Sequence, residues 1–481
     1  MSDSHSKEPS AIRHIIDELN ATLEAEVLNP LVNEQLEKCL LNLSSINVLK
    51  VDPKRLLANI KRLLIASSGD SKLDYDLLLE LLSKLIAISS FEDILTVFSI
   101  EDLATSLNSG IPALVRAANQ VISRSYPKGL FANSKIVDIL LDLYFDESQE
   151  ISIINSIERS ISNLCSDDLI RRRLMINNFP RLMAVRKKYK PTSMARLLEI
   201  LSSLCSYMDH TEFSEKLFVI RPEEILQSLE IDIVMFIHIL VYYTKVLGEV
   251  DVIEVGGPSH NWLLRYVRSI VPTYGQIFAQ LEEYSDVKYF ARSYLFNFFR
   301  KLSYLEDSSI FRELDDTYIH LSPASTYLTD FLSFVNPAYL FEYHPTLITR
   351  FSELTPSKLG VIRNLVADPA CFAMLKDHFT AESILAMPYM EQMVLLQRFS
   401  QFSHSSEYLL HELPKVMSNL ISAEDRNITE SETVALRRES IENLLKYEDS
   451  VWHISLKNEL IKIQGGRPRS ELHADIASSY I

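Results

Sequence analysis

Apolar residues recur along this chain with the spacing of α-helices, and the clearest instance begins with a proline. Residues 111–125 read Ile-Pro-Ala-Leu-Val-Arg-Ala-Ala-Asn-Gln-Val-Ile-Ser-Arg-Ser. Proline suits the first turn of a helix because its missing N–H would have no partner there. The apolar side chains that follow fall on one stripe of such a helix: Leu114, Val115, Ala118 and Ile122. We therefore expect a helix with one buried face, preceded by another apolar helix at 100–107.

The same stripe returns at intervals close to 40 residues. Steps of 39, 44 and 39 residues place its four positions on three further sets: Ile153, Ile154, Ile157 and Ile161; Leu197, Leu198, Leu201 and Cys205; and Phe236, Ile237, Leu240 and Thr244. This period is typical of HEAT and armadillo repeats, whose helix pairs bury their apolar faces only by stacking on one another. The pattern predicts an all-α, HEAT/armadillo-like α-solenoid.

Helical periodicity elsewhere extends the array to about ten or eleven helix pairs. The ends of each predicted helix are defined to within a few residues. Among the predicted helices are 53–66, 75–88, 136–145, 169–185 and 408–421. Residues 248–261 hold three of the chain's ten glycines and are predicted to be a linker. We therefore expect an N-terminal repeat half at 1–247, a C-terminal repeat half at 262–464 and a flexible tail at 465–481.

The low glycine content bears on the fold class, and the acidic charge bears on the kind of partner. Ten glycines in 481 residues is well below the average usage of about 7%. Because β-turns favour glycine, strands are not expected. The chain has 48 Lys and Arg residues against 64 Asp and Glu residues, for a net charge of −16. Such a charge repels phosphate backbones and suits a basic protein partner or simple solubility.

The cysteines and the hydropathy pattern predict a cytoplasmic protein, with a nuclear location also open. Four cysteines lie far apart and form no Cys-x-x-Cys pair: Cys39, Cys165, Cys205 and Cys371. This usage is typical of free thiols in a reducing compartment. The polar residues 1–10 do not resemble a secretory signal. The most apolar run, 231–247, contains titratable side chains and is expected to be too short and too polar to span a bilayer.

The sequence contains no recognisable catalytic, cofactor or metal motif, so we expect no enzyme activity. Gly256-Gly257-Pro258 matches neither a P-loop nor a dinucleotide fingerprint. His404 and His411 come nearest to a metal site, but without a third ligand they are better interpreted as surface or core histidines. Neither a Gly-x-Ser-x-Gly elbow nor a supported Cys–His pair is found. The chain is therefore expected to use no cofactor and no metal.

Three stretches have features of nucleic-acid binding sites. The Arg-Arg-Arg run at 171–173 follows two aspartates, so we interpret it as a charged helix face capped by acids. The Lys-Lys-Tyr-Lys stretch at 187–190 lies nearby and keeps a modest basic patch open at that edge. Aromatic residues between Tyr284 and Tyr304 resemble a stacking platform for single strands, but their helical spacing favours a place in the core.

A solenoid usually binds partners along the row of its second helices, and the repeat alignment predicts which side chains share that row. Three columns of equivalent positions lie beside or opposite the apolar stripe: Arg116, Asn155, Glu199 and His238; Gln120, Arg159, Ser203 and Tyr242; and Ser123, Ser162, Ser206 and Lys245. The candidate partner-binding residues are those of the first two columns, with Lys245 of the third column and Glu158 added. Glu158, Glu199 and Tyr242 are favoured because acidic and aromatic groups suit a basic partner. Arg116 could instead join neighbouring repeats and contact no ligand.

Four longer strings resemble a known family. They are Tyr-Pro-Lys-Gly-Leu-Phe-Ala-Asn-Ser-Lys-Ile-Val-Asp-Ile-Leu-Leu-Asp at 126–142, Asp-Leu-Ile-Arg-Arg-Arg-Leu-Met-Ile-Asn-Asn-Phe-Pro at 168–180, Pro-Tyr-Met-Glu-Gln-Met at 388–393 and Glu-Leu-Pro-Lys-Val-Met at 412–417. They are similar to yeast proteasome assembly chaperones of the HEAT-repeat type, a family also described as DNA mismatch-repair proteins. The resemblance covers nearly the whole chain apart from the linker and the tail.

This resemblance implies a C-shaped HEAT solenoid without catalytic activity. It implies binding to the C-terminal domain of one AAA-ATPase subunit of the proteasome regulatory particle. A neighbouring ATPase and a large non-ATPase scaffold subunit would join the same base module, and the chaperone would leave before the mature proteasome forms. No short motif marks the contact residues of this family, so the candidates remain those of the repeat alignment.

Two other functions stay open at the level of the sequence. The arginine run and the family's older description suggest a DNA mismatch-repair accessory factor, although the net charge of −16 argues against direct nucleic-acid binding. A general HEAT-repeat adaptor, such as a transport receptor or a phosphatase scaffold, is compatible with the fold alone. Neither nucleic acid nor a membrane is expected as a direct partner.

Overall fold

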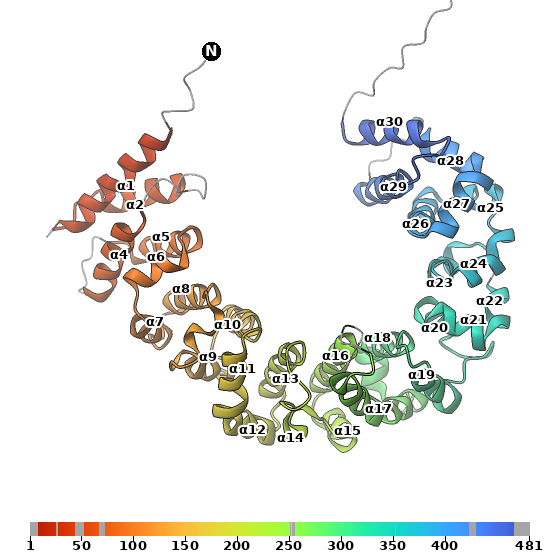
Figure 1. Ribbon diagram of the computed structural model, residues 1–481, viewed down its shortest axis with the longest axis horizontal. Coiled ribbons are helices and arrows are strands. Elements are labelled where there is room, and N and C mark those ends of the chain that lie inside the picture. Colours follow the sequence, from red (N-terminus) through yellow and green to blue (C-terminus); the bar gives the residue numbers. More distant parts are fainter. Residues whose placement is uncertain are drawn as a thin grey trace, which may run out of the picture. The chain divides into compact units, whose positions relative to one another are not determined.

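The computed structural model describes residues 8–25, 27–43, 52–66, 73–250, 252, 255–351, 353–422 and 430–465, and every element assigned in these ranges is a helix (Figure 1). The all-α repeat fold predicted from the sequence is therefore confirmed. The chain divides into two compact units, Met1–Ser269 and Ile270–Ile481.

The first unit consists of successive helix pairs. Its helices are α1 (Glu8–Glu24), α2 (Val32–Asn42), α4 (Lys54–Ala66), α5 (Tyr75–Ile88), α6 (Phe91–Val97), α7 (Ile100–Leu107), α8 (Pro112–Ser123), η1 (Lys128–Phe131), α9 (Ile136–Phe145), α10 (Ile151–Leu164), α11 (Asp168–Arg172), η2 (Arg173–Asn177), α12 (Phe179–Lys188), α13 (Pro191–Cys205), α14 (Glu215–Phe218), α15 (Pro222–Ile231) and α16 (Ile233–Val250). Helices α5, α8, α10, α13 and α16 each pack against the next, and we call them the second-helix row. Helices α4, α7, α9, α12 and α15 pack against their partners in that row.

The apolar stripe read from the sequence forms the contact between these helices. Of its sixteen positions, only Leu114, Ile237 and Thr244 are not fully buried. Burying a Leu or Ile side chain stabilises a fold by about 1.5–3 kcal/mol. The stripe therefore holds the row together.

Side chains from one repeat also satisfy carbonyl groups at the helix ends of the repeat before it. Arg124 donates to the Ser89 carbonyl oxygen at 3.0 Å, and Asn163 donates to the Ser123 carbonyl oxygen at 2.7 Å. The last four carbonyl groups of an α-helix have no partner within the helix. These bonds between repeats therefore fix the register of the stack and leave fewer polar groups unpaired.

The second unit begins within α17 (Pro258–Ala279) and repeats the same plan. Its remaining helices are η3 (Val287–Ala291), α18 (Arg292–Ser303), α19 (Ser309–Leu314), η4 (Asp315–Ile319), α20 (Leu328–Phe334), α21 (Pro337–Tyr343), α22 (Pro345–Arg350), η5 (Pro356–Lys358), α23 (Leu359–Leu365), α24 (Pro369–Leu375), η6 (Lys376–His378), α25 (Ala381–Leu385), α26 (Tyr389–Phe399), α27 (Ser403–Glu412), α28 (Pro414–Ile421), α29 (Ser431–Leu444) and α30 (His453–Ile463). Helices α20, α23, α26 and α29 each pack against the next. The rings of Phe296 and Phe331, whose centres lie 5.1 Å apart, connect α18 to α20.

The aromatic stretch between Tyr284 and Tyr304 is only partly core, which corrects the expectation from its spacing. Phe298 and Phe299 are fully buried, whereas Tyr289 and Phe290 are 74% and 64% exposed. The stretch begins with the π-helical turn η3. Because a π-turn changes the number of residues per turn, it rotates the side chains that precede α18 away from the buried face.

Prolines divide two of the predicted helices. The predicted helix 408–421 is α27 followed by α28, which starts at Pro414 because proline cannot donate to the preceding turn. The predicted helix 169–185 is divided into α11, the π-helical η2 and α12, with Pro180 in the first turn of α12.

The ends of the predicted linker are helical. Gly248 lies in the last turn of α16, and Asn261 lies near the start of α17. Residues 251, 253 and 254 of this linker, and 466–481 of the predicted tail, lie outside the described residues.

Helix α16 contains the most apolar run of the chain, and it is longer than the sequence analysis expected. It has 18 residues, and among the described helices it alone is long and apolar enough to cross a membrane by length and composition. That test is also passed by core helices of soluble proteins. Met235, Phe236 and Leu240 are buried in α16, which packs against α13 and α15. These contacts make α16 a core helix of the repeat stack.

We predict that Asn364→Ala destabilises the second unit. The buried Asn364 amide donates to the carbonyl oxygens of Leu332 at 3.0 Å and Val335 at 2.6 Å. Loss of these bonds should lower the free energy of unfolding by about 1–3 kcal/mol, measured by urea denaturation with circular dichroism. Asn297→Ala, at an exposed position in α18, is the control and should change it by less than about 0.5 kcal/mol. Equal effects would contradict the role of Asn364.

Candidate functional site

The candidate partner-binding residues all lie on four adjacent helices of the second-helix row, α8, α10, α13 and α16. The structure thus brings them onto neighbouring helices, as the repeat alignment predicted. Their exposure differs, however. Arg116, Asn155, Arg159 and Lys245 are exposed, while the others are half-buried or buried. The exposed side chains define the surface that a partner could touch, and we call these four residues the row surface.

Two members of the row surface have partners within the chain. The Arg116 guanidinium lies 3.5 Å from the Glu150 carboxylate, next to the start of α10. Arg116 therefore joins neighbouring repeats, the alternative that the sequence left open. Lys245 in α16 pairs with Glu199 in α13. Exposed pairs of this kind contribute little to stability, and a partner can replace them at low cost.

Asn155 and Arg159 are the freest members of the row surface. Both are exposed in α10, and neither makes a hydrogen bond or ion pair with another side chain in the described part of the structure. Four residues apart on one helix, they lie on the same face. They can therefore form new hydrogen bonds without breaking existing ones.

The two acidic candidates already have partners within the protein. Glu158 accepts a hydrogen bond of 2.8 Å from the buried Tyr144 hydroxyl of α9. Glu199 pairs with Lys245, and its carbonyl oxygen accepts from the Ser203 hydroxyl at 3.1 Å. Both carboxylates are half-buried. The exposed members of the row surface are thus neutral or basic, and not acidic as the preferred candidates had suggested.

Tyr242 does not lie on the surface, which corrects its prediction as a binding residue. Its side chain is 3% exposed, and its hydroxyl donates to the Phe218 carbonyl oxygen at 2.9 Å. Burial raises the pKa of Tyr242 well above its ordinary value. Tyr242 is equivalent to Gln120 and Arg159 in the repeat alignment. Its side chain is buried because both α13 and α15 pack against α16.

The remaining predicted positions are less informative. Gln120 is half-buried and accepts a hydrogen bond of 3.3 Å from the Ser83 hydroxyl of α5. His238, Ser123 and Ser162 are half-buried, and Ser206 is exposed.

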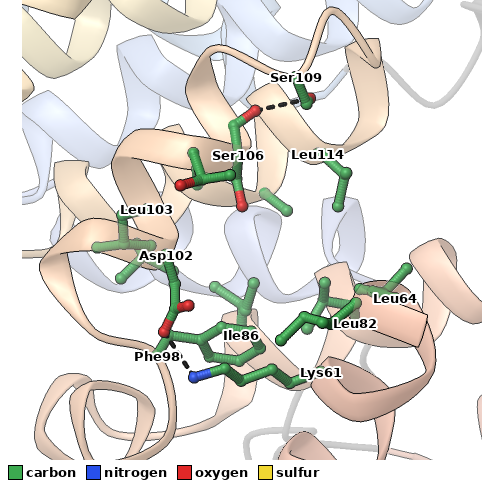
Figure 2. Close-up of a pocket in the computed structure, with 15 residues that line it drawn as sticks. Lys61, Leu64, Leu82, Ile86, Phe98, Asp102, Leu103, Ser106, Ser109 and Leu114 are labelled. Atoms are coloured by element: carbon green, nitrogen blue, oxygen red, sulfur yellow. Dashed lines mark hydrogen bonds and ion pairs between the residues drawn. The ribbon is translucent and has the colours of Figure 1, made fainter. Parts of the chain in front are cut away.

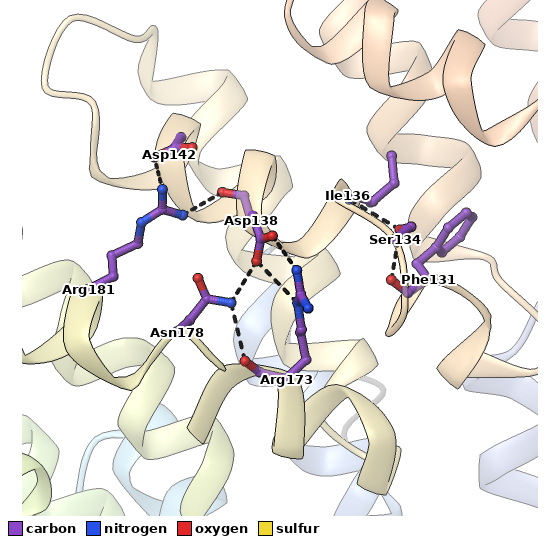
Figure 3. Close-up of polar contacts among 8 residues, drawn as sticks. All are labelled: Phe131, Ser134, Ile136, Asp138, Asp142, Arg173, Asn178 and Arg181. Atoms are coloured by element: carbon purple, nitrogen blue, oxygen red, sulfur yellow. Dashed lines mark hydrogen bonds and ion pairs between the residues drawn. The ribbon is translucent and has the colours of Figure 1, made fainter. Parts of the chain in front are cut away.

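The arginine run at 171–173 is a structural feature, as interpreted from the sequence. Arg172 pairs with Asp168 at 3.0 Å within α11. Arg173 reaches back to Asp138 of α9, which also accepts from the Asn178 amide at 2.7 Å (Figure 3). Arg181 donates to the Asp138 carbonyl oxygen at 2.8 Å. The positive charges of the run are therefore largely compensated.

Asp138 is the centre of this network. Burial alone would raise the pKa of Asp138, but hydrogen bonds from Arg173 and Asn178 outweigh it and hold the pKa below its ordinary value. Asp138 belongs to the string 126–142, while Arg173 and Asn178 belong to the string 168–180. Two of the strings that carry the family resemblance are therefore bonded to each other.

An apolar cleft of about 320 Å³ lies between α4, α5, α7 and α8, and the sequence analysis did not anticipate it (Figure 2). Leu82 and Ile86 line its floor, and the Lys61 ammonium pairs with the Asp102 carboxylate at 2.6 Å on one side. Leu114 borders the cleft, which explains why this stripe position is only half-buried. Such a lining can accept apolar side chains, but it offers few polar groups to a ligand.

The clustering of titratable side chains and the burial of the thiols bear on metal binding and on thiol reactivity. No three His, Cys, Asp or Glu side chains among them could hold a metal ion. Burial raises the pKa of Cys39 to about 11 and those of Cys165 and Cys205 to about 12, so these thiols stay protonated at neutral pH. The His404 imidazole lies 2.9 Å from the Val366 carbonyl oxygen, which is a structural contact.

Comparison with known sequences identifies relatives over nearly the whole chain. Two family models match: "DNA mismatch repair protein HSM3, N terminal domain" over residues 13–248 and the C-terminal domain of the same protein over residues 260–481. A protein of Eremothecium gossypii is 40% identical over 94% of both chains, and one of Saccharomyces cerevisiae is 37% identical over 96% of both. Both carry the name "DNA mismatch repair protein HSM3".

Among solved structures, a chain from a study of cadherin and β-catenin aligns with 92% of this chain. The sequences are 14% identical and the TM-score is 0.35. A likeness of that degree carries no conclusion about function.

We predict that Tyr242→Phe destabilises the first unit, because the Phe218 carbonyl oxygen loses its donor in a buried setting. The free energy of unfolding should fall by about 1–2 kcal/mol, measured by urea denaturation. Tyr207→Phe removes a hydroxyl from a side chain that is 48% exposed and should change it by less than about 0.5 kcal/mol. A similar loss in both variants would mean that the hydroxyl of Tyr242 is not specifically needed.

Proposed function

Because the chain belongs to the HSM3 family, we propose that it is a non-catalytic assembly chaperone for the base of the proteasome regulatory particle. In this proposal it binds the C-terminal domain of one AAA-ATPase subunit. It promotes assembly of the base with a neighbouring ATPase and a large non-ATPase scaffold subunit. The strings at 126–142, 168–180, 388–393 and 412–417, which resemble yeast chaperones of this kind, support the choice of partner.

The observation that carries a binding role is the open row surface. Neighbouring helices present Arg116, Asn155, Arg159 and Lys245 to solvent on a stack whose helix contacts are already satisfied. Arg159 and Asn155 have no partner among the described residues. Their charges and amide groups suit a folded domain that offers carboxylates and backbone carbonyls. A rigid row of helices is also suited to holding one subunit while another is added.

The family descriptions and the buried thiols support a non-catalytic function. The descriptions of the matching family models name no enzyme activity, and the buried thiols described above are poor nucleophiles at neutral pH. We further propose that the protein acts in the cytoplasm, with a nuclear location also open, since its four cysteines are buried free thiols.

The name that these relatives carry favours a second candidate function, that of a DNA mismatch-repair accessory factor. The compensated arginine run and the net charge of −16 speak against direct contact with DNA. Any repair function would then depend on protein partners. A general HEAT-repeat adaptor remains the broader alternative, because the fold alone does not select a partner.

We predict that the double variant Arg116→Glu/Arg159→Glu binds the ATPase C-terminal domain at least about tenfold more weakly than the wild type, because like charges replace two donors of the row surface. Isothermal titration calorimetry with the recombinant C-terminal domains of the regulatory-particle ATPases measures the affinity. Arg13→Glu, at an exposed position of α1 outside the row, is the control. Wild-type affinity in a folded double variant would place the contact elsewhere. Failure of every ATPase domain to bind the wild type would refute the proposal.

We also predict that the purified protein does not bind DNA tightly. A fluorescent 30-base-pair duplex with one mismatch should show no saturable anisotropy change with micromolar protein in about 50 mM salt. Nanomolar affinity that falls steeply by about 200 mM salt would contradict this prediction and favour a direct role in mismatch repair.

A further inference from the structure

A second surface, independent of the row surface, lies in the second unit. A cleft of about 390 Å³ opens between α18, α20, α23 and α26. Three arginines line it, Arg300, Arg363 and Arg398, together with the aromatic residues Tyr304 and Phe334. We call this the arginine cleft. Among the residues that the structure describes, no carboxylate belongs to its lining, although the chain as a whole carries a net charge of −16.

In the described part of the chain, no carboxylate pairs with any of the three arginines. None of them takes part in an ion pair within the described ranges. This sets them apart from Arg172, Arg173 and other arginines, which pair with carboxylates. Arg300 and Arg363 are exposed, while Arg398 is half-buried. Three uncompensated cations on one cleft of an acidic protein form a site of concentrated positive charge.

Arg398 is held in place before any ligand arrives. Its Nε donates to the Arg363 carbonyl oxygen at 2.8 Å, and its Nη1 donates to the Gln401 side-chain oxygen at 2.7 Å. The guanidinium carbon lies 4.6 Å from the centre of the Phe402 ring. Burial, and then the charges of Arg363 and Arg300, lower the pKa of Arg398 below its ordinary value. The cations therefore repel one another, and an anion would relieve that repulsion.

A purely structural role explains only part of this arrangement. Each arginine lies in the last turn of its helix, where a cation interacts favourably with the helix dipole. Arg398 also satisfies the carbonyl group of Arg363. However, the guanidinium groups of Arg300 and Arg363 donate to no group among the residues that the structure describes. Helix capping therefore leaves two of the three cations unexplained.

The cleft also keeps open space beside the cations. Gly360 forms part of its wall, and a Cβ atom there would lie 3.7 Å from the Ser333 Cβ, which is ordinary contact. The Tyr304 hydroxyl donates to the side-chain oxygen of Asn364, another lining residue, at 3.4 Å, and this bond restrains the Tyr304 ring. Aromatic rings and arginines together suit a ligand that combines carboxylates with apolar carbon.

We propose that the arginine cleft binds a short acidic segment of a partner protein, whose carboxylates pair with Arg300, Arg363 and Arg398. Arginine forks match carboxylates in a bidentate manner. A peptide places two or three carboxylates in the cleft and need carry no further charge. A nucleic acid would continue its phosphate backbone over a protein that is acidic outside the cleft. Charge complementarity therefore selects an acidic peptide.

The test uses the full-length protein and a fluorescein-labelled peptide Gly-Glu-Glu-Leu-Glu-Glu-Leu-Gly, with fluorescence anisotropy as the readout. Binding is expected at about 50 mM salt and should weaken as salt screens the charges. A peptide with Gln in place of each Glu should bind at least about tenfold more weakly. The double variant Arg300→Gln/Arg363→Gln should weaken binding of the acidic peptide by about tenfold or more. Both positions are exposed, so the fold should be preserved, as circular dichroism would verify.

Two further variants separate the cleft from general charge. Arg350→Gln removes an exposed arginine in α22 that does not line the cleft, and it should leave the affinity within about twofold. Gly360→Leu keeps the charge but fills the cleft, and it should weaken binding at least about threefold. If Arg350→Gln weakens binding as much as the double variant, or if Gly360→Leu has no effect, the peptide lies outside the cleft and the proposal is wrong.

Other occupants of the cleft give distinct results. Tighter binding of a 12-nucleotide single-stranded DNA or of inorganic phosphate than of the acidic peptide would overturn the assignment to a protein partner. Self-association of the wild type in analytical ultracentrifugation, lost in the double variant, would show instead that a second copy of the chain covers the cleft.

Discussion

The whole structure depends on the burial of one apolar stripe per repeat against the next repeat. Helices such as α7, α20 and α23 have seven or eight residues, whereas isolated helices shorter than about 12–15 residues are marginal in water. None of them is expected to persist alone. Stacking supplies both the apolar contact and the donors for unpaired helix ends, as with Asn163 and Asn364. Stability is therefore shared between neighbours, which is the property that defines a solenoid.

This construction determines where function can reside. Several charged groups near the helix contacts are paired within the chain, for example Arg173 with Asp138 and Lys245 with Glu199. A pair of this kind stabilises the register of two repeats, but its charged groups are then not free to bind a partner protein. The residues open to binding are those that stacking leaves unpaired. On the row surface they are Asn155 and Arg159, and in the second unit they are the cations of the arginine cleft.

The family resemblance and the binding surface rest on different residues. The strings 126–142 and 168–180 meet through the network centred on Asp138, which joins neighbouring repeats (Figure 3). They identify the family because they specify how its repeats pack. Partner choice depends instead on exposed side chains of the second helices, which no short motif marks. Recognition of the family and recognition of its contact surface therefore depend on separate sets of residues.

Helical spacing in the sequence was enough to determine the repeat fold and several helix bounds, including those of α5, α7 and α9. It also predicted the row that carries the candidate residues. It misplaced Tyr242, because a period of 3.6 residues assigns a side chain to a face but does not show what covers that face. Likewise, Arg300 and Arg398 are 98 positions apart in the chain and line one cleft only because α18, α20, α23 and α26 stack in succession. Local periodicity determines the elements, whereas the contacts between repeats decide which side chains are buried, paired or free.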